Sequence, residues 1–139
     1  MRIILADTNK IFWLFRAMML YNSNFSHSEF VLFIKNNTVY VSTFILNELY
    51  IVANRNTIYC NVADIERFVM AVGFRVYWSV KLPIDKYIEY VLDDMDVQIL
   101  KDAVELNATH ILTNNLKDFH NDQIKKDFWI LVISNLDDL

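Results

Sequence analysis

Short β-rich runs alternate with longer helical segments along this chain, and the alternation restricts the fold more than any other feature. The β-rich runs lie within residues 2–9 and at 38–42, 74–78, 109–113 and 128–134. Helices are expected between them at 11–21, around 30–34, and at 44–55, 61–73, 85–91, 93–104 and 120–125. Strands that alternate with helices form a parallel sheet with right-handed crossovers. The sequence therefore predicts an α/β fold.

The composition is that of one domain, residues 1–139. Hydrophobic residues make up 55% and charged residues 22%, which is enough for one substantial core. A single Gly and a single Pro leave no room for a flexible linker. The lone Cys60 rules out an internal disulfide and a Cys-rich zinc site, and it suits a reducing, cytoplasmic location.

Charge and hydropathy exclude some functions. Polar residues from Asp7 to Arg16 interrupt the apolar N-terminal stretch, so we expect soluble core and no membrane span. A net charge of -4 argues weakly against a wide basic groove for duplex nucleic acid. It does not argue against a nuclease, since a bound cation neutralises a cluster of acids.

The first strand ends at Asp7, which is followed by Thr8 and Asn9. Ligands of open α/β sheets bind at the carboxyl ends of the strands, so Asp7 is well placed for chemistry. The competing interpretation is that these three residues cap the next helix, because Asp, Thr and Asn are all favoured there. The positions of the other acids decide between the two.

Glu48 lies beside the apolar stripe of the helix at 44–55, whose expected buried members are Ile45, Leu49 and Val52. Ser42 or Thr43 can cap this helix. Glu48 either pairs with a base such as Arg55 or points over the strand ends toward Asp7, and the spacing favours the second.

An acid-rich turn opens the helix at 93–104. Asp93 or Asp94 is the natural N-cap, and Asp96 shares a face with Leu100 that must pack on the sheet. All three acids could simply complement the helix dipole, but one cap needs only one acid. Helical spacing turns Asp102 away from this face and predicts a surface or pairing residue.

A polar turn with an acid also follows the fourth strand. Thr113 ends that strand, and Asn115 and Asp118 follow in the turn. Asp118 either joins the other acids or caps the short helix at 120–125. Lys10 and Lys117 are near enough in sequence to steady a phosphate, although solvated surface lysine is the simpler interpretation of both.

The helix at 11–21 is apolar over most of its surface. Its apolar residues include Ile11, Phe12, Leu14, Phe15 and the methionines at 18 and 19. Such a helix is either deeply buried or packed against a partner protein. The stretch from Ile11 to Leu20 is thus a candidate docking surface.

The residues give little support to two rival sites. His27, His110 and His120 show no zinc-ligand spacing. A phosphoacceptor receiver domain would need an acidic pair before its central Asp and a lysine after the fifth strand, and this chain lacks a convincing form of either.

Four motifs, in order, resemble those of the PIN-domain ribonucleases, particularly the VapC-like toxins of bacterial toxin–antitoxin pairs. They are Asp-Thr-Asn at 7–9, Leu-Asn-Glu-Leu at 46–49, an Asp seven residues before Ala103, and Leu-Thr-Asn-Asn-Leu-Lys-Asp-Phe at 112–119. The resemblance covers essentially the whole chain. It implies a three-layer α/β/α PIN-like fold with a five-stranded parallel sheet of order 3-2-1-4-5.

The resemblance also implies a site that holds Mg²⁺ or Mn²⁺. By motif, its acids are Asp7, Glu48, Asp96 and Asp118, supported by Thr8, Asn9, Thr113 and Asn115. Asn115 stands where many members have another acid, so either Asp118 supplies the fourth carboxylate or the site has three acids and an amide.

The function expected from this resemblance is metal-dependent endonucleolytic hydrolysis of RNA, by the toxin of a toxin–antitoxin pair. Magnesium prefers oxygen ligands and keeps several waters, which a few acids can orient. The expected partners are RNA, a cognate antitoxin and a second copy of the chain. The alternative is a PIN-like binding or scaffolding module with a weakened site.

Overall fold

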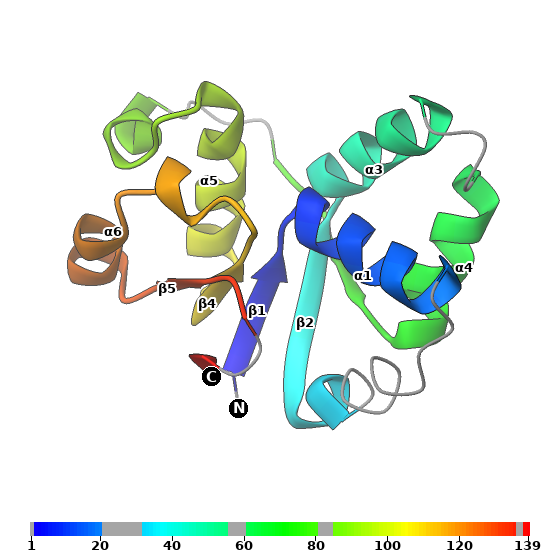
Figure 1. Ribbon diagram of the computed structural model, residues 1–139. Coiled ribbons are helices and arrows are strands. Elements are labelled where there is room, and N and C mark those ends of the chain that lie inside the picture. The colour runs from blue at the N-terminus through cyan, green and yellow to red at the C-terminus, as the bar shows by residue number, and fades with distance from the viewer. Residues whose placement is uncertain (1, 21–31, 56–60, 81–84, 136–137) are drawn as a thin grey trace.

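A computed structural model describes residues 2–20, 32–55, 61–80, 85–135 and 138–139. Its sheet has five strands, which all pair in parallel in the order β3-β2-β1-β4-β5 (Figure 1). The strands are β1 (Arg2–Ala6), β2 (Asn37–Ser42), β3 (Arg75–Tyr77), β4 (His110–Leu112) and β5 (Leu131–Ile133). The predicted fold class and strand order are therefore confirmed.

Helices cover both sides of the sheet, with α1, α3 and α4 on one side and α5 and α6 on the other (Figure 1). The α-helices are α1 (Thr8–Leu20), α3 (Thr43–Arg55), α4 (Val62–Val72), α5 (Val97–Glu105) and α6 (Asn121–Phe128), and residues 32–36 are also helical. The 3₁₀ turns are η1 (Asp85–Tyr90), η2 (Asp94–Asp96) and η3 (Leu116–Asp118). No helix within these described ranges is long and apolar enough to cross a membrane.

The central strands β1 and β4 carry the core. Ile4 and Leu5 of β1 and Ile111 of β4 are fully buried, and they belong to the same hydrophobic cluster as the inward faces of the helices. A strand covered on both faces needs apolar side chains at consecutive positions. This requirement explains the uninterrupted apolar run that precedes Asp7.

Local capping follows the sequence closely. Ser42 Oγ accepts a hydrogen bond from the Ile45 amide at the start of α3. Asn61 and Asp64 form a capping box on α4, and Gly73 ends that helix with φ 91°. Only a residue that tolerates the left-handed region without strain suits this last position.

The apolar surface of α1 belongs mainly to the core. Ile11, Leu14 and Phe15 are buried, so they are not available for docking, whereas Trp13 is exposed. The side chains of residues 17–20 lie outside the described part, as do the expected loop at 22–28 with His27, and Cys60 and Pro83.

Three smaller expectations need correction. Ala53 takes the buried position of α3 that was expected for Val52, which is partly buried and lines a pocket. Residues 85–90 form a 3₁₀ turn and not an α-helix. Helix α6 begins after His120, which makes no side-chain cap bond, so Asp118 does not cap it.

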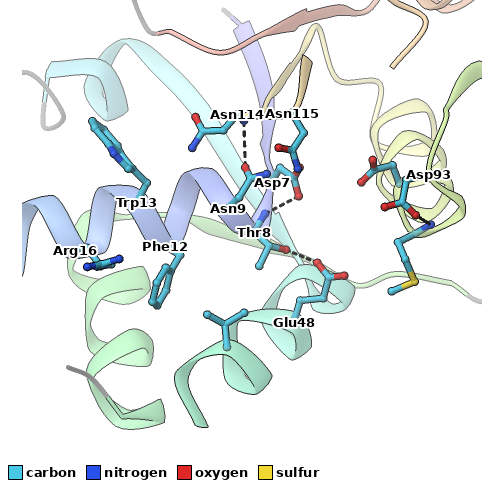
Figure 2. A pocket seen from close by; sticks show the side chains of 13 residues that line it. Asp7, Thr8, Asn9, Phe12, Trp13, Arg16, Glu48, Asp93, Asn114 and Asn115 are labelled. Carbon is cyan, nitrogen blue, oxygen red and sulfur yellow. Dashed lines mark hydrogen bonds between the residues drawn. The ribbon is translucent and has the colours of Figure 1, made fainter. Parts of the chain in front are cut away.

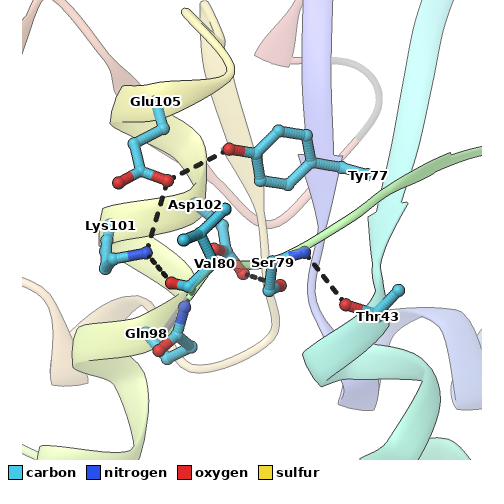
Figure 3. Close-up of polar contacts among 8 residues, drawn as sticks. All are labelled: Thr43, Tyr77, Ser79, Val80, Gln98, Lys101, Asp102 and Glu105. Atoms are coloured by element: carbon cyan, nitrogen blue, oxygen red, sulfur yellow. Dashed lines mark hydrogen bonds and ion pairs between the residues drawn. The ribbon is translucent and has the colours of Figure 1, made fainter. Parts of the chain in front are cut away.

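The sequence left Asp102 as either a surface or a pairing residue, and the structure shows the pairing role, with the side chain completely buried. Its carboxylate accepts hydrogen bonds from Ser79 Oγ at 2.7 Å and from Gln98 Nε2 at 2.9 Å (Figure 3). The neighbouring Lys101, 1% exposed, donates to the Val80 carbonyl and lies 3.3 Å from Glu105 Oε2. The segment that leaves β3 thus covers this face of α5.

Candidate active site

Asp7 lies at the carboxyl end of β1, where its backbone carbonyl accepts the first amides of α1. Its side chain is 3% exposed. The Oδ1 atom accepts a hydrogen bond from the Thr8 amide, and Oδ2 accepts one from the Thr113 hydroxyl, both at 2.7 Å. These two bonds fix the orientation of the carboxylate. The capping position and the site position expected for Asp7 are therefore compatible.

Glu48 reaches the same strand ends from α3. The Thr8 hydroxyl donates a hydrogen bond to Glu48 Oε2 (Figure 2). Of the two orientations considered from the sequence, Glu48 adopts the one directed toward Asp7. The Asn114 amide donates to Asn9 Oδ1 at 3.1 Å, which ties the turn after β4 to the start of α1.

Asp96 is placed by η2 at the start of α5. Asp93 caps this turn through a hydrogen bond from the Met95 amide, so Asp96 is left without a capping role. The Asp96 side chain is 7% exposed, and its Oδ2 atom is buried with no hydrogen-bond partner. Buried polar atoms are nearly always paired, so an unpaired carboxylate oxygen in a pocket is a candidate ligand for a bound group.

The turn after β4 supplies the remaining predicted residues. Thr113 is fully buried, and its hydroxyl, which donates to Asp7, also accepts a hydrogen bond from the Asn115 amide at 3.1 Å. Asp118 is half-buried in η3, and its charge contributes to the raised pKa values of both Asp7 and Asp96.

Asp7, Glu48 and Asp96 line one pocket of about 450 Å³, together with Thr8, Asn9 and Asn115. Asp118 does not line it. The pocket wall also includes residues that the sequence did not single out for it: Phe12, Trp13, Arg16, Val52, Asp93, Met95 and Asn114. Only Asp93, one of several acids in the turn before α5, carried a signal that could have identified it.

The acids of the pocket disfavour one another's charge. Burial, followed by the charges of Asp7, Asp93, Asp118 and Glu48, raises the pKa of Asp96 to about 7. Burial also raises the pKa of Asp7, although the hydrogen bonds from Thr113 and Thr8 oppose the shift. Repulsion between carboxylates in a partly desolvated site produces such shifts, and a bound cation reverses them.

A divalent cation fits this donor set with few protein ligands. Among the described residues, no group of three or more His, Cys, Asp and Glu side chains is arranged to hold a metal ion. Mg²⁺, however, is usually bound through one or two carboxylates and keeps several waters. The unpaired Asp96 oxygen and the neighbouring Asp7 carboxylate match that requirement.

Together, the sheet order and the acids at its carboxyl edge define a PIN-like α/β protein with an acidic pocket. The chain is similar in structure to a chain in the crystal structure of VapBC2 from Rickettsia felis, which was determined with a bound DNA fragment from the VapBC2 promoter. The TM-score is 0.64 at 17% identity, over 96% of this chain and 99% of that chain. At this identity the likeness shows the fold. No protein-family model and no curated protein matches the sequence.

Proposed function

We propose that this protein is a metal-dependent endoribonuclease that hydrolyses RNA phosphodiester bonds. The observation that carries the proposal is the buried, unpaired Oδ2 atom of Asp96 in a pocket with Asp7 and Glu48. A structural carboxylate at this depth would be hydrogen-bonded, as Asp102 is. The fold shared with VapBC2 supports the same class of protein.

The residues of the pocket have different roles in the proposed reaction. Asp7 and Asp96 would hold the cation, and the hydrogen bonds to Asp7 from Thr113 and from the Thr8 amide orient its carboxylate and oppose the rise in its pKa that burial causes. Glu48, oriented by Thr8, accepts the proton of the attacking water. Asp118, outside the pocket lining, adds a further negative charge near Asp7 and Asp96.

Mg²⁺ or Mn²⁺, when bound, lowers the pKa of an attacking water and stabilises charge on the attacking and leaving oxygens of the phosphodiester.

The test is cleavage of end-labelled RNA by the purified chain with Mg²⁺, with Mn²⁺ and with EDTA. We expect divalent-dependent internal cleavage that falls more than about 100-fold in Asp96→Asn and Asp7→Asn, since removing a ligand exceeds the 10- to 100-fold effects of residues that only support one. Asp94→Asn is the matched control, because Asp94 is an exposed acid of the same turn that does not line the pocket. Equal cleavage by the Asp96→Asn variant would refute the proposal.

A binding or scaffolding module is the second candidate, and the absence of a ready-made group of three ligands among the described residues favours it. Calorimetric titration with Mn²⁺ separates the two. Binding that is lost in Asp7→Asn supports the enzyme, whereas no binding by the parent chain supports the module.

We further propose that the protein is the toxin of a toxin–antitoxin pair, with a cognate antitoxin, a homodimeric state and a cytoplasmic location. The similar protein VapBC2 is the support for this assignment. Co-expression with the product of a neighbouring small reading frame would test it, with rescue of growth as the expected result.

A further inference from the structure

One wall of the pocket differs in character from the acidic wall. Helix α1 contributes Phe12, Trp13 and Arg16 to the lining (Figure 2). Trp13 is 55% exposed, although it lies on a helix whose Ile11, Leu14 and Phe15 are buried. An indole of this size left largely in water at a pocket is available for contact with a ligand.

The charges on this wall are also opposite to those across the pocket. Helix α1 contains Lys10 and Arg16 and no acidic residue, in a chain whose net charge is -4. Lys10 Nζ lies 4.9 Å from the centre of the Trp13 ring, and Arg16 Cζ lies 5.9 Å from that of Phe12. Of these two cations only Arg16 lines the pocket, so the lining has an acidic side with Glu48, Asp93 and Asp96 and an aromatic side that carries Arg16.

Lys10 is not the solvated surface lysine that the sequence suggested. It is 7% exposed, and burial lowers its pKa. Its stem packs within the fold while its ammonium group stays beside the indole. This placement holds a positive charge over one face of the Trp13 ring.

We propose that Trp13 is a stacking platform for an unpaired base of the RNA substrate, on the ring face that Lys10 does not cover, with Arg16 beside it to attract the adjoining phosphates. This inference rests on the proposed nuclease function, because it assigns the substrate-binding side of that same pocket. Aromatic side chains next to cations bind single strands by stacking on bases and neutralising phosphates. A duplex buries its base faces, so the platform selects single-stranded or looped RNA.

The first test measures binding without cleavage. A short single-stranded oligoadenylate is titrated in EDTA, with tryptophan fluorescence and anisotropy as readouts. Trp13→Ala is expected to raise Kd about 5- to 150-fold, the effect of one base–aromatic stack. Trp13→Phe should retain most of the affinity but lose the fluorescence quenching. Trp129→Ala is the matched control, because Trp129 is 86% exposed and does not line the pocket.

The second test addresses charge. Each phosphate contact on a single strand contributes about 0.7 to the slope of log Kd against log salt concentration. Arg16→Gln is expected to reduce that slope by about this amount. A slope equal to that of the parent chain would remove Arg16 from the subsite.

The two proposals fail in different ways. Parent-like oligonucleotide affinity in Trp13→Ala, or no binding by the parent chain, overturns the platform and leaves Trp13 as a surface for a protein partner. RNA cleavage that persists in Asp96→Asn overturns the nuclease assignment and leaves the binding result intact. If both hold, Trp13→Ala raises KM far more than it lowers kcat.

Discussion

Two buried aspartates on or next to α5, Asp96 and Asp102, have raised pKa values but very different surroundings. Asp102 is held by Ser79 and Gln98, and the charge of Lys101 favours its ionised form (Figure 3). Asp96 has an unpaired oxygen, and the charges around it belong to other acids. The same side chain is thus satisfied in one place and unsatisfied in the other.

The comparison separates a structural role from a functional one. A fully hydrogen-bonded buried network makes the fold specific, and its members depend on one another. An unpaired acid in a pocket lowers stability, and it persists where a ligand supplies what the protein does not. We therefore interpret the Asp102 network as architecture and the Asp96 pocket as the site.

The largest expected effect is on the structural side. Asp102→Ala would leave Ser79 and Gln98 without their acceptor and would remove one of the two acids near Lys101, which keeps its ion pair with Glu105. Removing one member of a buried charged network costs about 3–5 kcal/mol, so we expect a loss of that size in the free energy of unfolding. Urea denaturation at pH 7 measures it.

The exposed Asp94→Ala variant serves as the control for this measurement and should change stability by less than about 0.5 kcal/mol. A loss of under about 1 kcal/mol in Asp102→Ala would contradict the architectural role, because a single neutral hydrogen bond accounts for that much.

The next largest effect is expected on metal affinity. Thr113→Val keeps the shape of the side chain but removes the hydroxyl that donates to Asp7. The pKa of Asp7 should rise further, and affinity for Mn²⁺ should fall about 10- to 100-fold, as for other groups that orient a ligand. Titration calorimetry of both proteins at pH 7 checks this.

Thr109→Val is the comparison variant, because Thr109 also makes side-chain hydrogen bonds with the backbone and lies at the other end of β4. Unchanged Mn²⁺ affinity in Thr113→Val would show that the Thr113 hydroxyl stabilises the turn after β4 and does not orient a metal ligand.

The sheet and the shared pocket of the acids were both predicted from the sequence, but on different grounds. The number and type of strands followed from the alternation of β-rich and helical segments, whereas the strand order followed from the resemblance to PIN domains. Asp7, Glu48 and Asp96 share a pocket because the carboxyl ends of parallel strands meet at one edge. Their roles remain predictions.

The sequence could not predict what covers each helix face. Periodicity shows which side of α5 packs on the sheet, but the burial of Asp102 depends on the chain after β3, more than 20 positions away. Lys10 and Trp13, three positions apart, are neighbours on any helix, but periodicity did not show that the core would leave Trp13 exposed at the pocket. For this reason the acidic half of the pocket was predicted and the aromatic half was not.

The smallest expected effect is on the free energy of unfolding of Asp96→Asn. It follows from the raised pKa of Asp96, and it is a gain in stability where Asp102→Ala gives a loss. In the fold this pKa is raised from 3.8 to about 7. Between these values the folded state keeps a proton that the unfolded state has lost, so stability falls as the pH rises from 4 to 7 and levels off above 7. Asp96→Asn removes the charge and should gain about 1–2 kcal/mol at pH 8 in EDTA, after allowance for solvent screening.

Urea denaturation from pH 4 to pH 8 measures this gain, which should shrink steadily toward pH 4, where the folded carboxyl is protonated and that of the unfolded chain is about half protonated. Saturating Mn²⁺ should then reverse the order at pH 8, because an ion that binds only the folded parent protein stabilises it by mass action. A variant less stable than the parent in EDTA at pH 8 would mean that Asp96 is satisfied in the fold as Asp102 is, and the distinction between the two clusters would fail.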